Sequence, residues 1–190
     1  MKKTTVLSVI LAGLLTQTAA IAKPRYEIEV DPSTFALDGY SLHVRMFPDS
    51  TSKWRLGVGV YSLEFPDAFV DINSENKNQG WNVDLDLGLG LFAEYYFSDN
   101  KHGLYAGAQL AYQKFNISNS QSGSEQQSFA NALLMPYVGY RLPLSTHYYV
   151  QGWLGVGYSE KVSGETQLGT RHYDLDPLVG FGALHVGYSF

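Results

Sequence analysis

The chain has 190 residues, contains no cysteine and carries a formal net charge of −5 at neutral pH. The lack of cysteine excludes a disulfide scaffold, a cysteine nucleophile, a thiolate metal site and a lipid-anchor cysteine. The acidic balance offers no basic surface for nucleic acid. The abundance of glycine and tyrosine favours specially packed strands over helices.

The N-terminal segment has the pattern of a secretory signal peptide. Lys2 and Lys3 precede an apolar run over 6–15, and the segment closes on Ala20-Ile21-Ala22. The apolar run is too short for a transmembrane helix. We therefore predict a signal peptide over 1–22 and a single domain over 23–190, which leaves 168 residues with a formal charge of −7.

Alternation of apolar and polar residues predicts eight strands in the remaining chain. Short connections rich in Pro, Asp, Asn and Gly alternate with longer ones rich in Ser, Asn, Gln and Glu. This order is typical of an all-β, closed, antiparallel up-and-down barrel, with both chain ends on the short-turn side. The predicted strands lie near 24–31, 38–47, 54–65, 80–97, 103–116, 129–142, 147–160 and 172–190.

Each strand has an aliphatic row and a row of polar residues and glycine. Alternation alone does not say which row faces inward. A soluble barrel has its aliphatic row inside, whereas a membrane barrel has its aliphatic row outside. Most strand glycines lie on the charged row, where a narrow eight-stranded interior requires small residues beside large ones. Gly152, Gly180 and Gly182 break the pattern. We therefore predict a transmembrane barrel with the polar row inside and a filled lumen.

The predicted lumen collects charged side chains, which need partners when they are buried. A structural network of ion pairs is the favoured interpretation, and a proton or ion path is the alternative. Aromatic residues on the same row, such as Phe92 and Trp153, argue against an open pore. His43 and His185 read as satisfied core histidines, no metal-ligand spacing stands out, and no cofactor is predicted. The predicted lumen residues are Glu27, Glu29, His43, Arg45, Arg55, Asp84, Asp86, Glu94, Arg141 and His185.

Aromatic residues gather at both ends of the aliphatic row. Such belts are typical of proteins that contact two membrane interfaces. The belt near the short turns comprises Trp54, Tyr95, Tyr140, Tyr148, Tyr188 and Phe190, and the belt near the long loops comprises Tyr40, Trp81, Tyr112 and Tyr158.

The last predicted strand ends the chain on Phe190, with Tyr188, Val186 and Leu184 at alternate positions before it. It resembles the closing strand of bacterial outer-membrane β-barrels. Residues 23–190 as a whole resemble the small eight-stranded barrels, such as the transmembrane domain of outer membrane protein A and outer membrane proteins X and W. The resemblance implies an outer-membrane location, contact with lipid and lipopolysaccharide, and recognition of the last strand by the barrel assembly machinery. A monomer is expected.

Closure of such a barrel would bring the last strand against the first. The inward row of the last strand includes Ser189, Gly187 and His185, and it should face Glu27 and Glu29. The sequence therefore predicts a contact between His185 and one of these carboxylates.

A polar cluster over 171–177 opens the last predicted strand at the long-loop side. His172 with Asp174 or Asp176 could orient a base for a hydrolase that acts on lipid A. The His-x-Ser pattern of the outer-membrane lipid A deacylases is absent, because Tyr173 and Asp174 follow His172. A polar junction between loop and strand is the simpler interpretation.

Three functions therefore remain open on sequence grounds. The favoured one is a structural or interaction role, in membrane integrity, surface contact or lipopolysaccharide association. The alternatives are a lipid A-modifying enzyme, either an acyl hydrolase or an acyltransferase, and a narrow channel.

Overall fold

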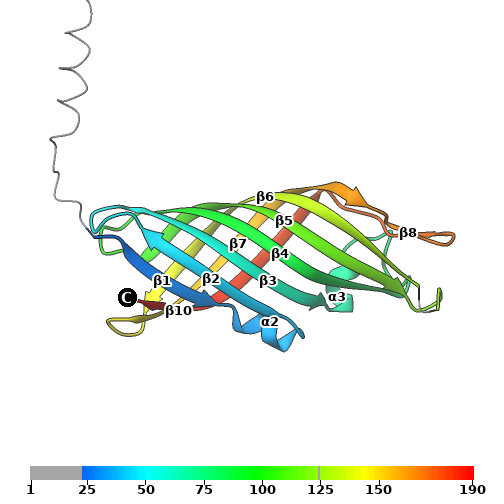
Figure 1. Ribbon diagram of the computed structural model, residues 1–190, viewed down its shortest axis with the longest axis horizontal. Coiled ribbons are helices and arrows are strands. Elements are labelled where there is room, and N and C mark those ends of the chain that lie inside the picture. The colour runs from blue at the N-terminus through cyan, green and yellow to red at the C-terminus, as the bar shows by residue number, and fades with distance from the viewer. Residues whose placement is uncertain (1–22, 124) are drawn as a thin grey trace, which may run out of the picture.

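The computed structural model describes residues 23–123 and 125–190, and the predicted signal peptide lies outside them. In this part of the chain eight antiparallel strands form a closed barrel in the order β1-β10-β7-β6-β5-β4-β3-β2 (Figure 1). The predicted all-β, eight-stranded architecture is confirmed. The strands are β1 (Arg25–Val30), β2 (Tyr40–Phe47), β3 (Trp54–Phe65), β4 (Trp81–Tyr96), β5 (Gly103–Asn119), β6 (Gln126–Pro143), β7 (Tyr148–Gly164) and β10 (Leu178–Ser189).

The short turns lie at one end of the barrel, together with the start of β1 and the C-terminus, and the long connections lie at the other (Figure 1). The long connections carry the short helix α3 (Asp67–Val70) and a hairpin of β8 (Gln167–Leu168) and β9 (Arg171–His172), whereas the helix α2 (Pro32–Ala36) follows β1 and lies beside the wall partway along the barrel (Figure 1). None of the helices in the described residues is long and apolar enough to cross a membrane. The predicted last strand began too early, because residues 171–172 belong to this hairpin.

The two rows of each strand separate as expected over most of the barrel. Side chains of the aliphatic row, such as Leu91, Val138 and Leu154, are more than half exposed on the outer face. Glycines on the inner row make room for large neighbours. A Cβ atom at Gly187, for example, would collide with the Tyr149 ring. The wall is therefore apolar outside, and its inner row packs closely where large side chains lie against glycine.

A β-bulge in β4 reverses this pattern near the long-loop end. Leu85 pairs with Phe115 of β5, whereas Leu87 pairs with the adjacent Lys114, so β4 carries one extra residue at Asp86. An extra residue exchanges the inner and outer rows beyond it.

Two sequence predictions are wrong for this reason. Asp84 and Asp86 do not lie in the lumen, and Asp86 instead pairs on the surface with Lys114 at 2.8 Å. Trp81 does not join the outer belt, because its ring is buried and packs against Tyr173 inside the barrel mouth.

Candidate functional site

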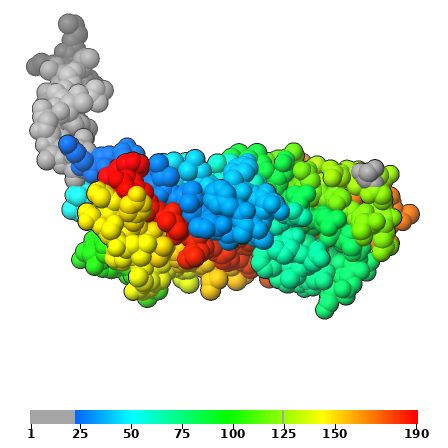
Figure 2. Space-filling view, turned by 90° about the horizontal axis from the view of Figure 1, so that it is seen from below, coloured from blue at the N-terminus to red at the C-terminus, as the bar shows by residue number. Residues whose placement is uncertain are grey.

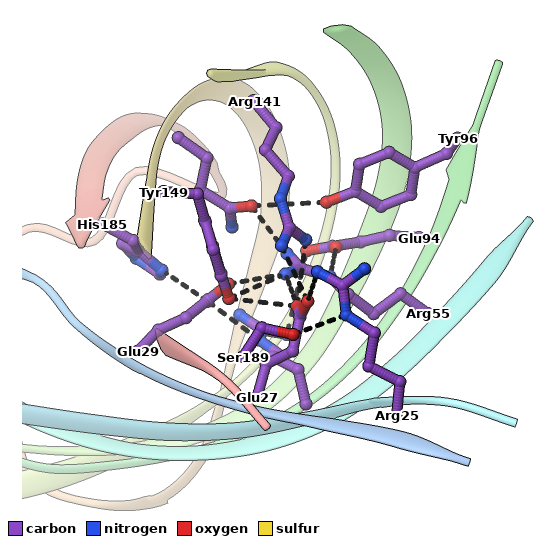
Figure 3. A network of polar contacts seen from close by, with 12 residues as sticks. Arg25, Glu27, Glu29, Arg55, Glu94, Tyr96, Arg141, Tyr149, His185 and Ser189 are labelled. Atoms are coloured by element: carbon purple, nitrogen blue, oxygen red, sulfur yellow. Dashed lines mark hydrogen bonds and ion pairs between the residues drawn. The ribbon is translucent and has the colours of Figure 1, made fainter. Parts of the chain in front are cut away.

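Charged side chains from five strands converge inside the barrel near the short turns (Figure 3). We call this group the plug. All of its members are at most 1 % exposed. Three carboxylates meet three guanidinium groups there, and the more exposed Arg25 adds a contact of 3.0 Å to Glu27. It consists of Glu27 and Glu29 from β1, Arg45 from β2, Arg55 from β3, Glu94 from β4 and Arg141 from β6.

Arg55 is the centre of the plug. Its Nη1 atom lies 2.8 Å from Glu27 Oε2 and 2.6 Å from Glu29 Oε1, and its Nε donates to Glu94 Oε2 at 2.5 Å. Arg141 grips Glu27 with both terminal nitrogens, at 2.7 and 2.9 Å. Forked contacts of this kind are the strongest form of charge-assisted hydrogen bond.

Neutral side chains add hydrogen bonds to the plug, while Arg45 Nη1, Arg141 Nε and Gln151 Nε2 have no hydrogen-bond partner among the described residues. The Tyr149 hydroxyl lies 3.0 Å from Glu27 Oε2 and 2.8 Å from Glu29 Oε1, and Arg55 Nη2 donates to Gln151 Oε1 at 2.8 Å. The Arg141 guanidinium also stacks on the Tyr149 ring, 3.4 Å from its centre. Tyr149 and Gln151 were not among the predicted lumen residues. Their position on the polar row of β7 would have indicated that they face the interior.

Two histidines form the upper boundary of the plug. His185 Nδ1 lies 3.0 Å from Glu29 Oε2, so the predicted contact between the last and first strands is present. The centre of the His43 ring lies 4.7 Å from that of the His185 ring, which is tilted by 32°, and 5.3 Å from that of the Phe92 ring, which it meets edge to face. His43 Nδ1 is buried with no hydrogen-bond partner among the described residues, so His43 is not the satisfied histidine that the sequence predicted.

Above the plug the barrel holds a cavity of about 670 Å³. We call it the chamber. Its wall is mostly aliphatic and aromatic, and the bulge in β4 contributes to it by turning Val83 and Leu85 inward. Polar side chains of the wall bond to one another, since Gln109 and Gln113 both donate to the Tyr61 hydroxyl at 2.7 and 3.2 Å. Other lining residues are Leu63, Phe115, Phe129, Leu133, Met135 and Trp153.

Two long connections are tied together over the mouth of the chamber. Asn76 Nδ2 donates to the Asp174 carbonyl at 2.8 Å, and the Asp174 amide donates back to Asn76 Oδ1 at 2.9 Å. Asn73 Nδ2 adds a bond of 2.9 Å to the Asp174 carboxylate. Burial of the neighbouring Tyr173 raises the pKa of its hydroxyl to about 12. These contacts fix the loop that the sequence singled out as a polar cluster.

The structure does not bring the members of that cluster together. The His172 Nε2 atom lies 3.1 Å from Thr166 Oγ1. Asp176 accepts from the Leu178 amide at 2.9 Å, and Asp174 bonds to the asparagines above. Among the described residues no hydrogen bond joins His172 to either aspartate, so each side chain holds its own part of the loop.

The remaining belt aromatics lie on the outer face. Near the short turns, rings contact one another: Trp54 with Tyr95 at 5.3 Å, and Tyr188 with Tyr148 at 5.0 Å and with Phe190 at 5.1 Å. Tyr140 lies exposed near this end, and Tyr40, Tyr112 and Tyr158 lie exposed toward the long loops.

No family model and no curated protein matches the chain. Among solved structures, it is similar to the N-terminal β-barrel domain of Pseudomonas aeruginosa OprF, with a TM-score of 0.45 and 17 % identity over 88 % of this chain and 96 % of that one. It is also similar to Neisserial surface protein A, with a TM-score of 0.42 and 13 % identity over 87 % and 94 % of the two chains. The fold is that of a small eight-stranded barrel.

Proposed function

We propose that the protein is a monomeric outer-membrane barrel with a closed lumen and a structural or interaction role in membrane integrity, surface contact or lipopolysaccharide association. One observation carries the proposal: the outer wall is apolar while the charges are buried inside. Soluble proteins rarely expose an apolar surface of this extent. Lipid is the natural environment of a barrel with this arrangement.

The outer aromatics support the same placement. The rings at the two ends of the aliphatic band are suited to the two membrane interfaces. With the short turns on the periplasmic side, β10 and Phe190 would be presented to the barrel assembly machinery, and the tied loops would face outward, near lipopolysaccharide.

The plug favours a closed barrel over a narrow channel. Arg55 bridges carboxylates from β1 and β4 across the interior, so an ion would have to displace strong pairs in a poorly solvated site. In the part of the chain that the structure describes, His172 bonds to Thr166 and not to a carboxylate, so this histidine lacks the partner that would orient it as the base of a lipid A hydrolase.

Two measurements test the proposal. The folded protein should migrate differently from the boiled protein on a semi-native gel, and its reconstitution into planar bilayers should give no discrete conductance. Solubility without detergent together with an unshifted band would overturn the membrane barrel, and steady single-channel steps would overturn the closed lumen. Mass spectrometry of lipid A from cells with and without the protein should show unchanged acylation.

A further inference from the structure

The barrel wall is incomplete beside the last strand. β10 pairs with β7 from Leu178 to Tyr188, but it pairs with β1 only from Val186 to Ser189. In the described residues, the upper part of β10, over 178–185, therefore has no strand on its other side.

The cause lies in the sequence after β1. Pro32 lacks the amide that a further ladder would need, and Asp31 caps α2 by accepting from the Ser33 amide at 2.9 Å. The chain thus leaves the wall after Val30 and turns into α2, which packs beside β10. Figure 2 shows this face, with the blue of α2 next to the red of β10.

The chamber reaches the outer surface at this gap. Phe181 and Ala183 line it from the inner row of β10, and Thr34 lines it from α2. Gly180 and Gly182 line the same cavity although they lie on the outer row. These are glycines that broke the sequence pattern, and here they leave the outer row without side chains. A Cβ atom at Gly180 would meet nothing within 4 Å, so the space beside it is open.

The position of the gap along the barrel axis indicates its depth in the membrane. Leu178 pairs with Tyr158, which belongs to the aromatic residues near the long loops, and Gly182 pairs with Leu154 farther toward the middle of the wall. With the membrane placement proposed above, the gap opens just below the outer interface, among the acyl chains of the outer leaflet.

We propose that the chamber binds one acyl chain of an outer-leaflet lipid, which enters sideways through the gap between β10 and α2. The proposal rests on the proposed membrane location. An acyl chain suits the chamber because the lining is mostly apolar, and three of its polar side chains, Tyr61, Gln109 and Gln113, bond to one another. Lipid ester oxygens are acceptors, and the uncovered edge of β10 presents backbone N–H groups as donors. The histidines above the plug set the depth that the chain reaches.

Trp153 provides a fluorescent reporter for this site, since it lines the chamber and the centre of its ring lies 6.2 Å from that of the Phe181 ring. The other tryptophans, Trp54 and Trp81, are removed by replacement with Phe. The protein is then reconstituted into vesicles of phosphatidylcholine with brominated acyl chains, and quenching of Trp153 fluorescence by bromine is measured. We expect clear quenching, because a brominated chain occupies the chamber.

Gly180→Phe, in the same background, places a ring across the gap, and quenching should fall at least twofold. Val58→Phe is the matched control: it also adds a ring at an exposed position of the outer wall, but on β3, outside both the chamber lining and the groove beside the gap, and it should leave quenching unchanged. Gly180→Leu repeats the test with a smaller side chain. Each variant must show the gel shift of a folded barrel.

Three results would overturn the proposal. Absence of quenching in a folded, inserted barrel would exclude an acyl chain in the chamber. Equal quenching in Gly180→Phe and Val58→Phe would exclude entry through the gap. A second experiment tests entry from the water through the mouth of the chamber: a brominated fatty acid is added to the protein in vesicles of unbrominated lipid. If Gly180→Phe does not reduce the quenching of Trp153 by this fatty acid, the chain enters through the mouth and not through the gap. Failure of the proposed function is separate, because the protein would then neither insert nor shift on the gel.

Discussion

The plug and the chamber fill the same barrel in opposite ways. In the plug, inward side chains are long, charged and joined by ion pairs, and Arg55 alone contacts three carboxylates. In the chamber they are apolar and leave a cavity of about 670 Å³. An eight-stranded barrel is therefore not always uniformly filled. Ion pairs close the end near the short turns, and the apolar side chains toward the long loops leave a cavity that a ligand could occupy.

Removal of the central cation should have the largest effect on this comparison. Arg55→Met leaves Glu27, Glu29 and Glu94 with too little positive charge in a buried site. Loss of one partner from a buried ion pair costs about 3–5 kcal/mol, and we expect the upper end of this range. Urea unfolding in lipid vesicles would measure the loss. Arg55→Met combined with Glu94→Gln should recover part of it, and an unchanged urea midpoint in Arg55→Met would mean that the plug does not stabilise the barrel.

Truncation of the tryptophan turned inward by the bulge should come next. Trp81→Ala removes a buried ring from the wall of the barrel mouth, and such truncations cost about 3 kcal/mol or more. Tyr158→Ala removes an aromatic from the outer face of the same end and is expected to cost about 1 kcal/mol. The same unfolding assay compares the two, and equal losses would return Trp81 to the outer face where the sequence placed it.

The tie over the chamber should contribute less. Asn76→Ala removes two hydrogen bonds to Asp174 and leaves the half-buried Asp174 amide without its partner, at a cost of about 1 kcal/mol. The effect should be local: limited proteolysis should cut the loop over 166–177 faster, while the gel shift of the barrel persists. Ser74→Ala in the same connection, at an exposed position, serves as the control. Unaltered cleavage of Asn76→Ala would show that the loops are held by other contacts.

The smallest effect is expected at the bulge itself. Asp86 and Lys114 form an ion pair on the surface, each side chain 44 % exposed, and exposed pairs contribute about 0–1 kcal/mol. Asp86→Asn should therefore change the urea midpoint little, even at low salt. A loss comparable with that of Arg55→Met would place Asp86 in the lumen after all.

The sequence predicted the parts of the structure that depend on alternation. It placed Arg55, Glu94 and the other plug residues on inward rows, and the closure of the barrel placed His185 beside Glu29. It failed at Asp84, Asp86 and Trp81 because residues 83–89 alternate strictly through the bulge and give no sign of an extra residue.

The pairing within the plug and the existence of the chamber lay beyond the sequence for a different reason. Both depend on register between strands that are far apart in the chain. The gap beside β10 likewise depends on the register between β1 and β10. The predicted strand over 24–31 did not show that residues 178–185 would have no partner strand on that side.

The plug also constrains how the barrel can form. Glu27 meets an arginine 114 positions later, and Glu29 meets a histidine 156 positions later. No hairpin of neighbouring strands contains a complete set of partners, so these carboxylates stay hydrated until the first and last thirds of the chain come together. Contacts this distant in sequence form late in folding. The carboxylate and guanidinium groups of the plug therefore lose their hydration together, and closure of the barrel between β1 and β10 is a single cooperative step in folding.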